Sequence, residues 1–271
     1  MRGKRILITG GAGSIGSELC RQLFKTNRIY ALDINEMGLH ELKTDLGIPV
    51  RVGDIRNKET LRNVFDDFKP QVVFHAAAYK SVDMMEYVPE EAIDTNVKGT
   101  YNVLSYSKIY EVDRFIFIST DKVNTNSIMG STKKLGEIMT RNSGKGYTAV
   151  RFANVMGSRG SLLEIWQRQI NENKPITVTD EKMERYFMTI PEAVTLVTKA
   201  TELGEGGETI CFQVGRPVKI IDLAKEIVQR LGRDIPIKII GNRGGEALSE
   251  KLLTDEEERV AIKKGDFWII K

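Results

Sequence analysis

The stretch Arg5-Ile-Leu-Ile-Thr-Gly-Gly-Ala-Gly-Ser-Ile-Gly16 decides the fold of this chain. Its first part, Arg5–Thr9, is an apolar run with the length of a buried β-strand. Its second part is rich in glycine and leads directly into Ile15–Phe24, which has the periodicity of an amphipathic helix. A strand that passes through glycines into a helix is the beginning of a βαβ unit. The stretch therefore predicts a parallel sheet with helices packed against it.

The same alternation of apolar runs and helical patterns continues through the first 150 residues. Repeated strand–helix order predicts βαβ units, which place helices on both faces of a parallel sheet. We expect the run Arg114–Ser119 at the sheet centre because its apolar residues do not alternate with polar ones. The longest predicted helical stretch, Pro89–Tyr110, precedes this run. The predicted fold class is α/β, a Rossmann-type doubly wound parallel sheet. Its predicted strands are Arg5–Thr9, Arg28–Asp33, Val50–Gly53, Gln71–His75, Arg114–Ser119 and Tyr147–Arg151.

The glycines meet the needs of a bound dinucleotide, namely a tight turn, a bare backbone near the pyrophosphate and close packing of helix on strand. Gly11, Gly13 and Gly16 fit G-x-G-x-x-G, and counting from Gly10 gives G-x-x-G-x-x-G. The second predicted strand ends at Asp33, whose carboxylate can bind two ribose hydroxyls and repels a 2′-phosphate. This favours NAD, and it leaves NADP open because a nearby arginine can adapt the site. The alternative is a glycine-rich turn of another α/β fold.

Further cofactor contacts are expected where the third and fourth predicted strands end. Asp54 and Ile55 follow the third strand, a common place for an adenine contact, and the small residues Ala76, Ala77 and Ala78 follow the fourth. Small side chains let the backbone approach a cofactor. For His75, which precedes them, a structural role under the sheet and a functional role are equally expected.

After about residue 155 the strand-like runs become shorter and Gly and Pro become denser. Ile221–Leu231 predicts an amphipathic helix that Gly232 ends. We therefore expect an NAD(P)-binding Rossmann core over residues 1–155. Residues 156–271 should form mainly a smaller substrate-binding lobe, with crossings back to the core and a soft boundary between the two parts.

Composition excludes several classes of protein. The 271 residues are 41% apolar and 28% charged, which is typical of one large globular unit. The net charge of +3 comes without a basic cluster, so we expect no nucleic-acid partner. No apolar run is long enough for a membrane span, and the N-terminus lacks the pattern of a signal peptide, which predicts a cytoplasmic protein. Cys20 and Cys211 lie far apart and form no metal or disulfide pattern, which indicates a reducing compartment.

The fifth predicted strand leads into Ser119-Thr-Asp-Lys122, and Met129-Gly-Ser-Thr-Lys133 follows at the beginning of a helix. With these motifs the chain resembles the extended short-chain dehydrogenases/reductases, and within them the nucleotide-sugar 4,6-dehydratases of capsule, O-antigen and flagellin-glycan synthesis. The resemblance covers nearly the whole chain. Besides the glycine stretch it rests on His75-Ala-Ala-Ala-Tyr-Lys80, Met85-Glu-Tyr-Val-Pro89, Asn96-Val-Lys-Gly99, Asn154-Val-Met-Gly-Ser-Arg-Gly-Ser161, Arg185-Tyr-Phe-Met-Thr-Ile-Pro191 and Gly245-Glu246…Glu250.

The resemblance implies a reaction in which a hydride passes from sugar C4 to NAD(P)+, water is lost across C5–C6, and the hydride returns to C6. Loss of the C6 hydroxyl needs an acid, which Asp121 can be if burial raises its pKa. Removal of the C5 proton needs a base, which Lys122 can be if desolvation or a neighbouring cation lowers its pKa. Neighbours on a regular strand face opposite ways, so the two need an irregular loop to share a site. The alternative is a solvated Asp-Lys turn.

The same resemblance implies that Thr120 hydrogen-bonds the sugar 4-hydroxyl and that Lys133 holds the nicotinamide ribose. The family usually has Tyr at position 129, as the base for the 4-hydroxyl, whereas this chain has Met129, whose thioether cannot accept a proton. Asp121, Lys133 through a water, or Lys80 can replace that base. An enzyme that has decayed to cofactor binding is the alternative.

Substrate contacts are expected mainly in the second half of the chain. Asn154 and Arg159 resemble the family's nucleotide-sugar contacts, and Arg243 its diphosphate contact. The usual Arg-Pro-Gly-Glu-Lys is Arg243-Gly-Gly-Glu-Ala247 here, so these contacts depart from the pattern. The candidate substrate-binding residues are Lys80, Asn154, Arg159, Arg243 and Glu246, and the catalytic ones are Thr120, Asp121, Lys122, Lys133 and Met129 at the tyrosine position. The candidate cofactor-binding residues are Gly10, Gly13, Ser14, Ile15, Gly16, Asp33, Asn35, Asp54, Ile55, Ala76, Ala77, Ala78, Asn96 and Lys133.

The function that the sequence favours is an NAD(P)-dependent 4,6-dehydratase acting on UDP-N-acetylglucosamine, with C5 inversion left open and a homo-oligomer expected. A 4-epimerase shares hydride removal at C4 but needs no C5 base, so the Asp121-Lys122 pair disfavours it. A non-catalytic NAD-binding sensor or partner-binding protein is the third hypothesis. Met129 favours it, and the presence of Asp121, Lys122 and Lys133 opposes it.

Overall fold

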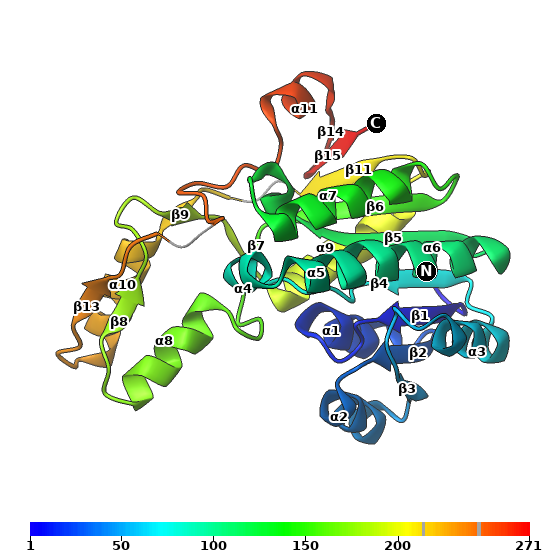
Figure 1. Cartoon of the computed structure of the whole chain (residues 1–271), viewed down its shortest axis with the longest axis horizontal. Helices are drawn as coiled ribbons and strands as arrows, with labels where there is room; N and C mark the ends of the chain where they lie inside the picture. The colour runs from blue at the N-terminus through cyan, green and yellow to red at the C-terminus, as the bar shows by residue number, and fades with distance from the viewer. Residues whose placement is uncertain (213–214, 243–244) are drawn as a thin grey trace.

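A single large sheet runs through the computed structural model, which describes residues 1–212, 215–242 and 245–271 (Figure 1). Within these residues the strand order is β14-β15-β11-β6-β5-β4-β1-β2-β3. The strands from β3 to β11 pair in parallel, whereas β15 is antiparallel to β11 and β14 to β15. The order 3-2-1-4-5-6 is that of a doubly wound Rossmann sheet, which confirms the predicted fold class. The strands are β1 Arg5–Thr9, β2 Arg28–Asp33, β3 Val50–Val52, β4 Val72–His75, β5 Arg114–Thr120, β6 Tyr147–Phe152, β11 Thr209–Phe212, β14 Ile262–Lys264 and β15 Phe267–Ile270.

The sheet is apolar on both faces because helices cover both. In β1, Ile6 and Ile8 belong to one buried cluster and Leu7 to another, as alternate residues of a strand face opposite ways. The first cluster takes in residues of helices α1 Ser14–Leu23, α2 Glu36–Leu46 and α9 Ile190–Leu203. The second takes in residues of α3 Lys58–Phe68, α6 Thr100–Ile109 and α7 Ile128–Arg141. Burial on both sides is why these strands read as continuous apolar runs.

The long helical stretch predicted over Pro89–Tyr110 contains a widened turn. It consists of α5 Pro89–Ala92, a π-helical segment η1 Ile93–Gly99, and α6. Such π-helical turns are rare and occur mostly near functional sites. Here the turn carries Asn96, whose amide binds the backbone of Tyr79 twice: Oδ1 accepts from the Tyr79 N–H at 2.8 Å, and Nδ2 donates to the Tyr79 carbonyl at 2.9 Å. The turn thus fixes the loop that follows β4.

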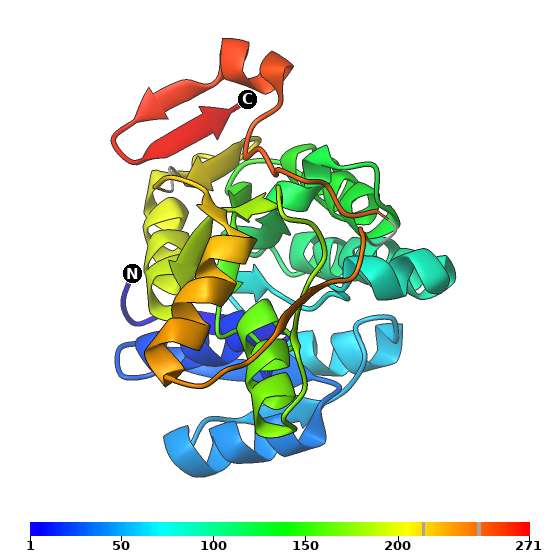
Figure 2. The same cartoon turned by 90° about the vertical axis from the view of Figure 1, so that its left-hand side faces the viewer.

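The chain after residue 155 divides between the sheet and a smaller lobe. Helix α9 and strands β11, β14 and β15 belong to the sheet layers, and the lobe lies beside them (Figures 1 and 2). The lobe has its own core around Trp166, Ile176 and Ile220. Its elements are α8 Leu162–Asn171, β8 Ile176–Val178, α10 Ile220–Leu231 and β13 Ile237–Ile239.

The remaining described elements are short. They are α4 Val82–Tyr87, the 3₁₀ turn η2 Asp121–Asn124, β7 Asn154–Met156, β9 Glu184–Arg185, β10 Phe187–Thr189, β12 Val218–Lys219 and α11 Asp255–Val260. Across the described ranges, no helix is long and apolar enough to cross a lipid bilayer.

Candidate active site

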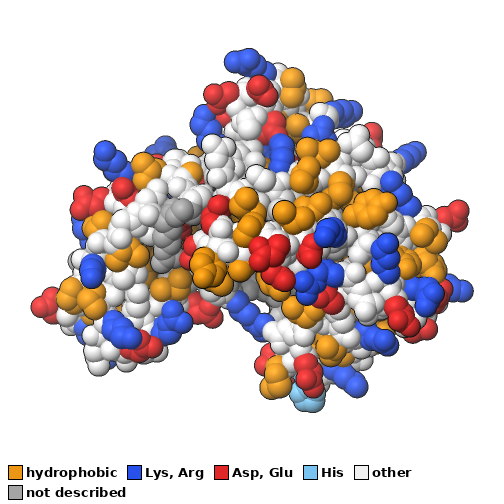
Figure 3. Space-filling model, viewed as in Figure 1, with side chains coloured by type: hydrophobic (Ala, Val, Ile, Leu, Met, Phe, Trp, Pro, Cys, Tyr) orange, Lys and Arg blue, Asp and Glu red, His pale blue; other side chains and the backbone are white. Residues whose placement is uncertain are grey.

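A cavity of about 500 Å³ lies at the carboxyl ends of the sheet strands, between the core and the lobe. The surface is hollowed between these two parts (Figure 3). Strands β1 and β4 are neighbours in the sheet and their connections leave in opposite directions, which is the topological switch point where such folds bind ligands. A second cavity of about 210 Å³ adjoins the first and shares Gly10, Gly13 and Arg159 with it.

The glycine turn between β1 and α1 is built so tightly that side chains cannot replace its hydrogens. Gly10 has a φ of +71°, and a Cβ there would lie 2.5 Å from the backbone nitrogen of Ala77. A Cβ on Gly16 would lie 2.0 Å from the Gly10 carbonyl oxygen. Gly13 begins helix α1 without a side-chain cap, so N–H groups of the first turn remain available to an anion. The turn therefore fits a pyrophosphate.

The smaller cavity presents the carboxylate of Asp33 in a fixed orientation. Asp33 Oδ2 accepts from the Ala12 N–H and Oδ1 from the Asn35 N–H, both at 2.9 Å. Asn35 in turn caps α2 by accepting from the Gly38 N–H at 3.1 Å. The cavity has the chemistry for an adenosine ribose, because a carboxylate anchored on one side can bind two hydroxyls on the other. Its lining includes these predicted cofactor residues: Gly10, Gly13, Asp33, Asn35, Asp54, Ile55, Ala76, Ala77 and Ala78.

Two predicted residues lie behind the cavities rather than in their walls. His75 is completely buried between Thr9 and Thr100, with its ring nitrogens 2.6 and 2.9 Å from their hydroxyl oxygens. Burial lowers the pKa of His75 to about 3, so it stays neutral, which favours the structural role. Asn96 also lines neither cavity. It binds the backbone of Tyr79, which lines both, and its contact with a cofactor stays a prediction.

The irregular loop that the Asp121-Lys122 pair requires is the 3₁₀ turn η2 at the end of β5. Thr120 caps the turn by accepting from the Lys122 N–H at 3.4 Å. The Asp121 side chain is completely buried, and its Oδ1 accepts from Thr120 Oγ1 at 2.9 Å and from Lys122 Nζ at 3.2 Å. The alternative of a solvated turn is therefore wrong. Asp121 itself does not line the cavity, but Thr120 and Lys122 do.

The pKa expectations for this pair are confirmed for one member and wrong for the other. Burial raises the pKa of Asp121, as an acid needs. Burial alone would lower the pKa of Lys122, but the charges of Asp121 and Glu250 outweigh it and raise that pKa. The ammonium group donates to Asp121, to Asn154 Oδ1 at 2.9 Å and to Glu250 Oε2 at 3.1 Å. Lys122 is thus charged in this structure, and no neighbouring cation lowers its pKa below the usual value.

Met129 and Lys133 lie on the same side of α7 and both line the larger cavity. Met129 is 1% exposed and packs with Met85 and Ala92. Lys133 Nζ donates to the Ile118 carbonyl at 2.5 Å. Burial lowers the pKa of Lys133 to about 7, so near neutral pH a large fraction is a neutral amine.

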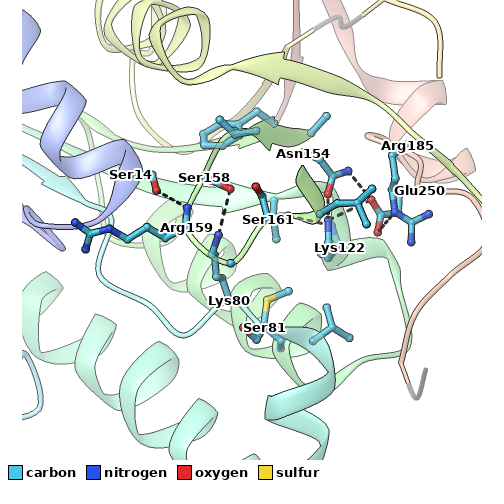
Figure 4. Close-up of a pocket in the computed structure, with 18 of the residues that line it drawn as sticks. Ser14, Lys80, Ser81, Lys122, Asn154, Ser158, Arg159, Ser161, Arg185 and Glu250 are labelled. Carbon is cyan, nitrogen blue, oxygen red and sulfur yellow. Dashed lines mark hydrogen bonds and ion pairs between the residues drawn. The ribbon is translucent and has the colours of Figure 1, made fainter. Parts of the chain in front are cut away.

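The predicted substrate residues in the described structure converge on the larger cavity (Figure 4). Lys80 Nζ donates to Ser158 Oγ at 3.3 Å, and partial desolvation lowers the pKa of Lys80. The backbone N–H of Arg159 donates to Ser14 Oγ at 3.0 Å, which joins its loop to the glycine turn. Asn154, Arg159, Lys80 and Glu246 all line this cavity, together with Ser14, Ile15 and Gly16. Arg243 lies outside the described residues.

Two buried charged residues of the cavity were not among the predicted site residues. Glu250 is 4% exposed and Arg185 is 8% exposed; Arg185 Nε lies 3.1 Å from Glu250 Oε1. Both stand in motifs of the resemblance, but a motif does not show which distant residue its side chain meets. Arg185 and Glu250 are identified as candidate site residues because they form a buried ion pair in the cavity wall. This burial can be seen only in the three-dimensional structure.

The fold and the site define a Rossmann-type dinucleotide-binding protein with a paired carboxylate and lysine at the end of β5. Residues 6–271 match the family described as "Polysaccharide biosynthesis protein", and the chain belongs to this family. The capsular polysaccharide biosynthesis protein CapD of Staphylococcus aureus is 44% identical over 94% of this chain and 46% of its own length. The chain thus spans about half the length of this relative.

Other similar proteins carry names of different enzymes. A UDP-glucose 4-epimerase of Rickettsia bellii is 33% identical over 98% of this chain and 82% of its own length. The solved structure of Pen from Bacillus thuringiensis is 32% identical, with a TM-score of 0.92 over 99% of this chain and 88% of Pen. DesIV of Streptomyces venezuelae, a dTDP-glucose 4,6-dehydratase solved with NAD and TYD bound, is 22% identical with a TM-score of 0.83, over 94% of this chain and 90% of its own. At that identity the likeness concerns the fold.

Proposed function

We propose that the chain catalyses the 4,6-dehydration of a nucleotide sugar, with UDP-N-acetylglucosamine as the substrate. The observation that carries this proposal is the Lys122 ammonium group, held 3.2 Å from the buried Asp121 carboxylate beside the cavity. Elimination of water needs one group that takes a carbon-bound proton and one that protonates the leaving hydroxyl, and this pair offers both. A nucleotide-sugar substrate is in keeping with the family, whose description is polysaccharide biosynthesis.

The proposed cofactor is NAD, which when bound supplies reversible hydride transfer at sugar C4 and C6. The bare glycine turn fits its pyrophosphate, and Asp33 fits the adenosine ribose hydroxyls. The NAD bound to DesIV, which shares the fold, supports this choice. NADP is disfavoured because Asp33 repels a 2′-phosphate, and because the nearby Arg56 is engaged by Asp54 at 2.7 Å and Glu91 at 2.9 Å.

Lys122 must release a proton before it takes one from C5. Of its two carboxylate partners, Asp121 is the better acceptor, because burial raises the pKa of Asp121 whereas Lys122 and Arg185 outweigh burial and lower that of Glu250. One proton transfer turns the ammonium–carboxylate pair into an amine and a carboxylic acid without changing its net charge. The amine then takes the C5 proton. The acid protonates the leaving C6 hydroxyl through Thr120, and Lys122 is an ammonium and Asp121 a carboxylate again.

The proton of the 4-hydroxyl needs a separate acceptor because the Met129 thioether cannot take it. Lys133 suits this role through a water molecule: it lines the cavity, and its pKa of about 7 leaves much of it neutral near neutral pH. After the elimination, the Lys122 ammonium group returns a proton to C5. The proton held by Lys133 then restores that ammonium group, and the site is ready for another turnover.

A 4-epimerase is the second candidate, and the similarity to the Rickettsia bellii enzyme favours it. The experiment that separates the two is incubation with UDP-N-acetylglucosamine and NAD in D₂O, analysed by mass spectrometry and NMR. Dehydration gives a product lighter by one water, with solvent deuterium and a readable configuration at C5. Epimerisation gives an isomer without deuterium at C5, and unchanged substrate supports the non-catalytic hypothesis.

Lys122→Met tests the role of this residue within the reaction. The variant should still remove hydride from C4, visible as transient NADH absorbance, but should not exchange the C5 proton with solvent. Lys225→Met, an exposed lysine on α10, is the matched control and should behave as the wild type. If Lys122→Met exchanges the C5 proton at the wild-type rate, Lys122 is not the base.

A further inference from the structure

The segment of residues 245–254, here called the strap, delivers a charged side chain into the active site. It leads from the region of the lobe to α11, and its backbone is held at two places. The Leu248 carbonyl accepts from the Glu184 N–H at 2.9 Å, and the Leu252 carbonyl accepts from Arg151 Nη1 at 2.7 Å. The backbone of the strap is therefore fixed on both sides of Glu250. These backbone hydrogen bonds position Glu250 in addition to the contacts of its side chain.

Glu250 joins three separate parts of the active site (Figure 4). Its Oε2 accepts from Lys122 Nζ at 3.1 Å and from Asn154 Nδ2 at 2.9 Å, and its Oε1 lies 3.1 Å from Arg185 Nε. These partners come from the turn after β5, from β7 and from β9. All four side chains line the larger cavity. A buried carboxylate with charge-assisted partners on both oxygens has little freedom to move.

Glu250 is also the second of two carboxylates that face Lys122. Asp121 and Glu250 face the ammonium group as anions, at 3.2 and 3.1 Å. Two further cations act on it, Arg185 from β9 and Lys80 from the loop after β4. The two carboxylates thus face Lys122, Arg185 and Lys80, and Glu164 also acts on Lys80. The loss of Glu250 therefore increases the positive charge around Lys122 by one unit. Such an increase favours loss of a proton from the remaining groups.

We propose that Glu250 is a positioning residue of the reaction: it acts through Lys122, which it holds beside Asp121, and its charge governs how readily Lys122 releases a proton. The inference rests on the proposed function for its place in the reaction. The charge effect itself can be measured without turnover. The same negative charge acts on Asp121, so both members of the catalytic pair respond to Glu250 in the same direction.

The test compares wild type with Glu250→Gln, which keeps the shape, removes the charge and leaves one acceptor oxygen in place of two. Acetic anhydride labels only neutral amines, and peptide mass spectrometry reads the labelling of Lys122 as a function of pH. The midpoint of labelling should fall by at least about 1 pH unit in Glu250→Gln, because a carboxylate this close typically shifts a pKa by 1–3 units. Under turnover, both limbs of the pH profile of kcat should move to lower pH, while KM changes less than kcat.

Two further variants separate charge from structure. Glu250→Asp keeps the charge on a shorter side chain, so its labelling midpoint should stay near that of the wild type while kcat falls. Glu258→Gln removes an exposed glutamate on α11 and should change neither quantity. The proposal is overturned if Glu250→Gln binds NAD and melts like the wild type, and the pH midpoint of Lys122 labelling is unchanged. The product analysis of the wild type tests the dehydratase proposal separately, because it does not depend on Glu250.

Discussion

Met129, which we propose occupies the tyrosine position, is a packed residue. It is 1% exposed, it joins Met85 and Ala92 in a small apolar cluster, and part of its surface faces the larger cavity. The cluster lies between α7 and the elements α4 and α5, which follow the loop after β4. The side chain therefore contributes to the shape of the cavity wall without any proton chemistry of its own.

Met129→Leu should leave turnover within a few-fold of wild type, because the swap conserves volume and the thioether transfers no proton; it should cost less than about 1.5 kcal/mol of stability. Met129→Ala should lower the free energy of unfolding by about 2–5 kcal/mol, as for other buried methionines. Calorimetry and steady-state kinetics measure these effects. Loss of turnover in a folded Met129→Leu variant would show that the sulfur has a specific role.

Met129→Tyr introduces a phenol four residues before Lys133, on the same side of α7. If the phenol reaches the 4-hydroxyl, turnover should be kept or raised, because a general base typically contributes 10²–10⁴-fold. The larger ring must fit in the apolar cluster, so the thermal stability of the variant is the control. A well-folded variant without turnover would contradict the expectation.

At the scale of single residues, the sequence predicted those site residues whose positions follow from a local sequence pattern. Gly10, Gly16 and Asp33 belong to one strand–turn–helix unit and the strand after it, so spacing alone places them together. Glu250 follows Lys122 at a distance of 128 residues, and no pattern indicates that their side chains meet. The raised pKa of Lys122 could not be predicted for the same reason, because it depends on that contact.

At the scale of elements, α11 anchors the strap through a buried ion cluster. Arg151 of β6 is fully buried and binds Glu137 of α7 and Glu257 of α11, with Nη–Oε distances of 2.7 Å to each. The same guanidinium group binds the Leu252 carbonyl of the strap at 2.7 Å. One arginine thereby joins the sheet, α7 and the strap that carries Glu250.

Glu257→Gln should reduce stability by about 2–3 kcal/mol at neutral pH. Although partial burial raises the pKa of Glu257, hydrogen bonds from Arg151 and Lys134 bring it down to about 2, below the ordinary value of 4.5. A lowered carboxyl pKa stabilises the folded state above the unfolded pKa. Wild type should therefore lose this advantage as the pH falls from about 5 towards 2.

Urea unfolding of wild type and Glu257→Gln between pH 7 and 3 measures this difference, with the exposed Glu256→Gln as control. The free-energy gap between wild type and Glu257→Gln should narrow as the pH falls. A gap that stays constant over this range would mean that the charge of Glu257 does not contribute to stability.

Elements with strong local patterns were predicted closely. The strands β1 and β2 have the predicted bounds, and β4, β5 and β6 differ from them by one residue, because buried parallel strands read as short apolar runs between polar or glycine residues. The π-helical turn at Asn96 was not predicted, since the widened turn has no distinct sequence pattern. The pairing of β8 with β13, separated by a helix-containing crossover, also needs the three-dimensional fold.

At the scale of the whole molecule, exposed apolar side chains gather over α6 and α7 (Figure 3). Tyr101 is 61% exposed, Ile109 is 70% exposed, and Leu135 and Ile138 are also exposed. Exposed apolar side chains gathered on one face are typical of protein–protein contact surfaces in soluble proteins. We therefore propose that this face joins two copies of the chain in a homo-oligomer.

Sedimentation velocity should show wild type as an oligomer, and the double variant Tyr101→Asp, Ile138→Asp should sediment as a smaller species. Charges in place of apolar side chains oppose burial of this face between subunits. Val260→Asp, on α11 and 63% exposed, is the matched control and should keep the wild-type mass. A monomeric wild type, or a double variant of unchanged mass, would contradict the proposal.

The position of Glu250 along the chain also determines the order in which the site is completed during synthesis. Strand β5 and the turn with Asp121 and Lys122 are synthesised before half of the chain has been made. The carboxylate that faces Lys122 arrives 128 residues later, and Glu257, which anchors its segment through Arg151, arrives later still. A nascent chain that already holds the glycine turn therefore still lacks one of the two carboxylates that face Lys122. Under the proposed function, turnover begins only when translation has passed the strap.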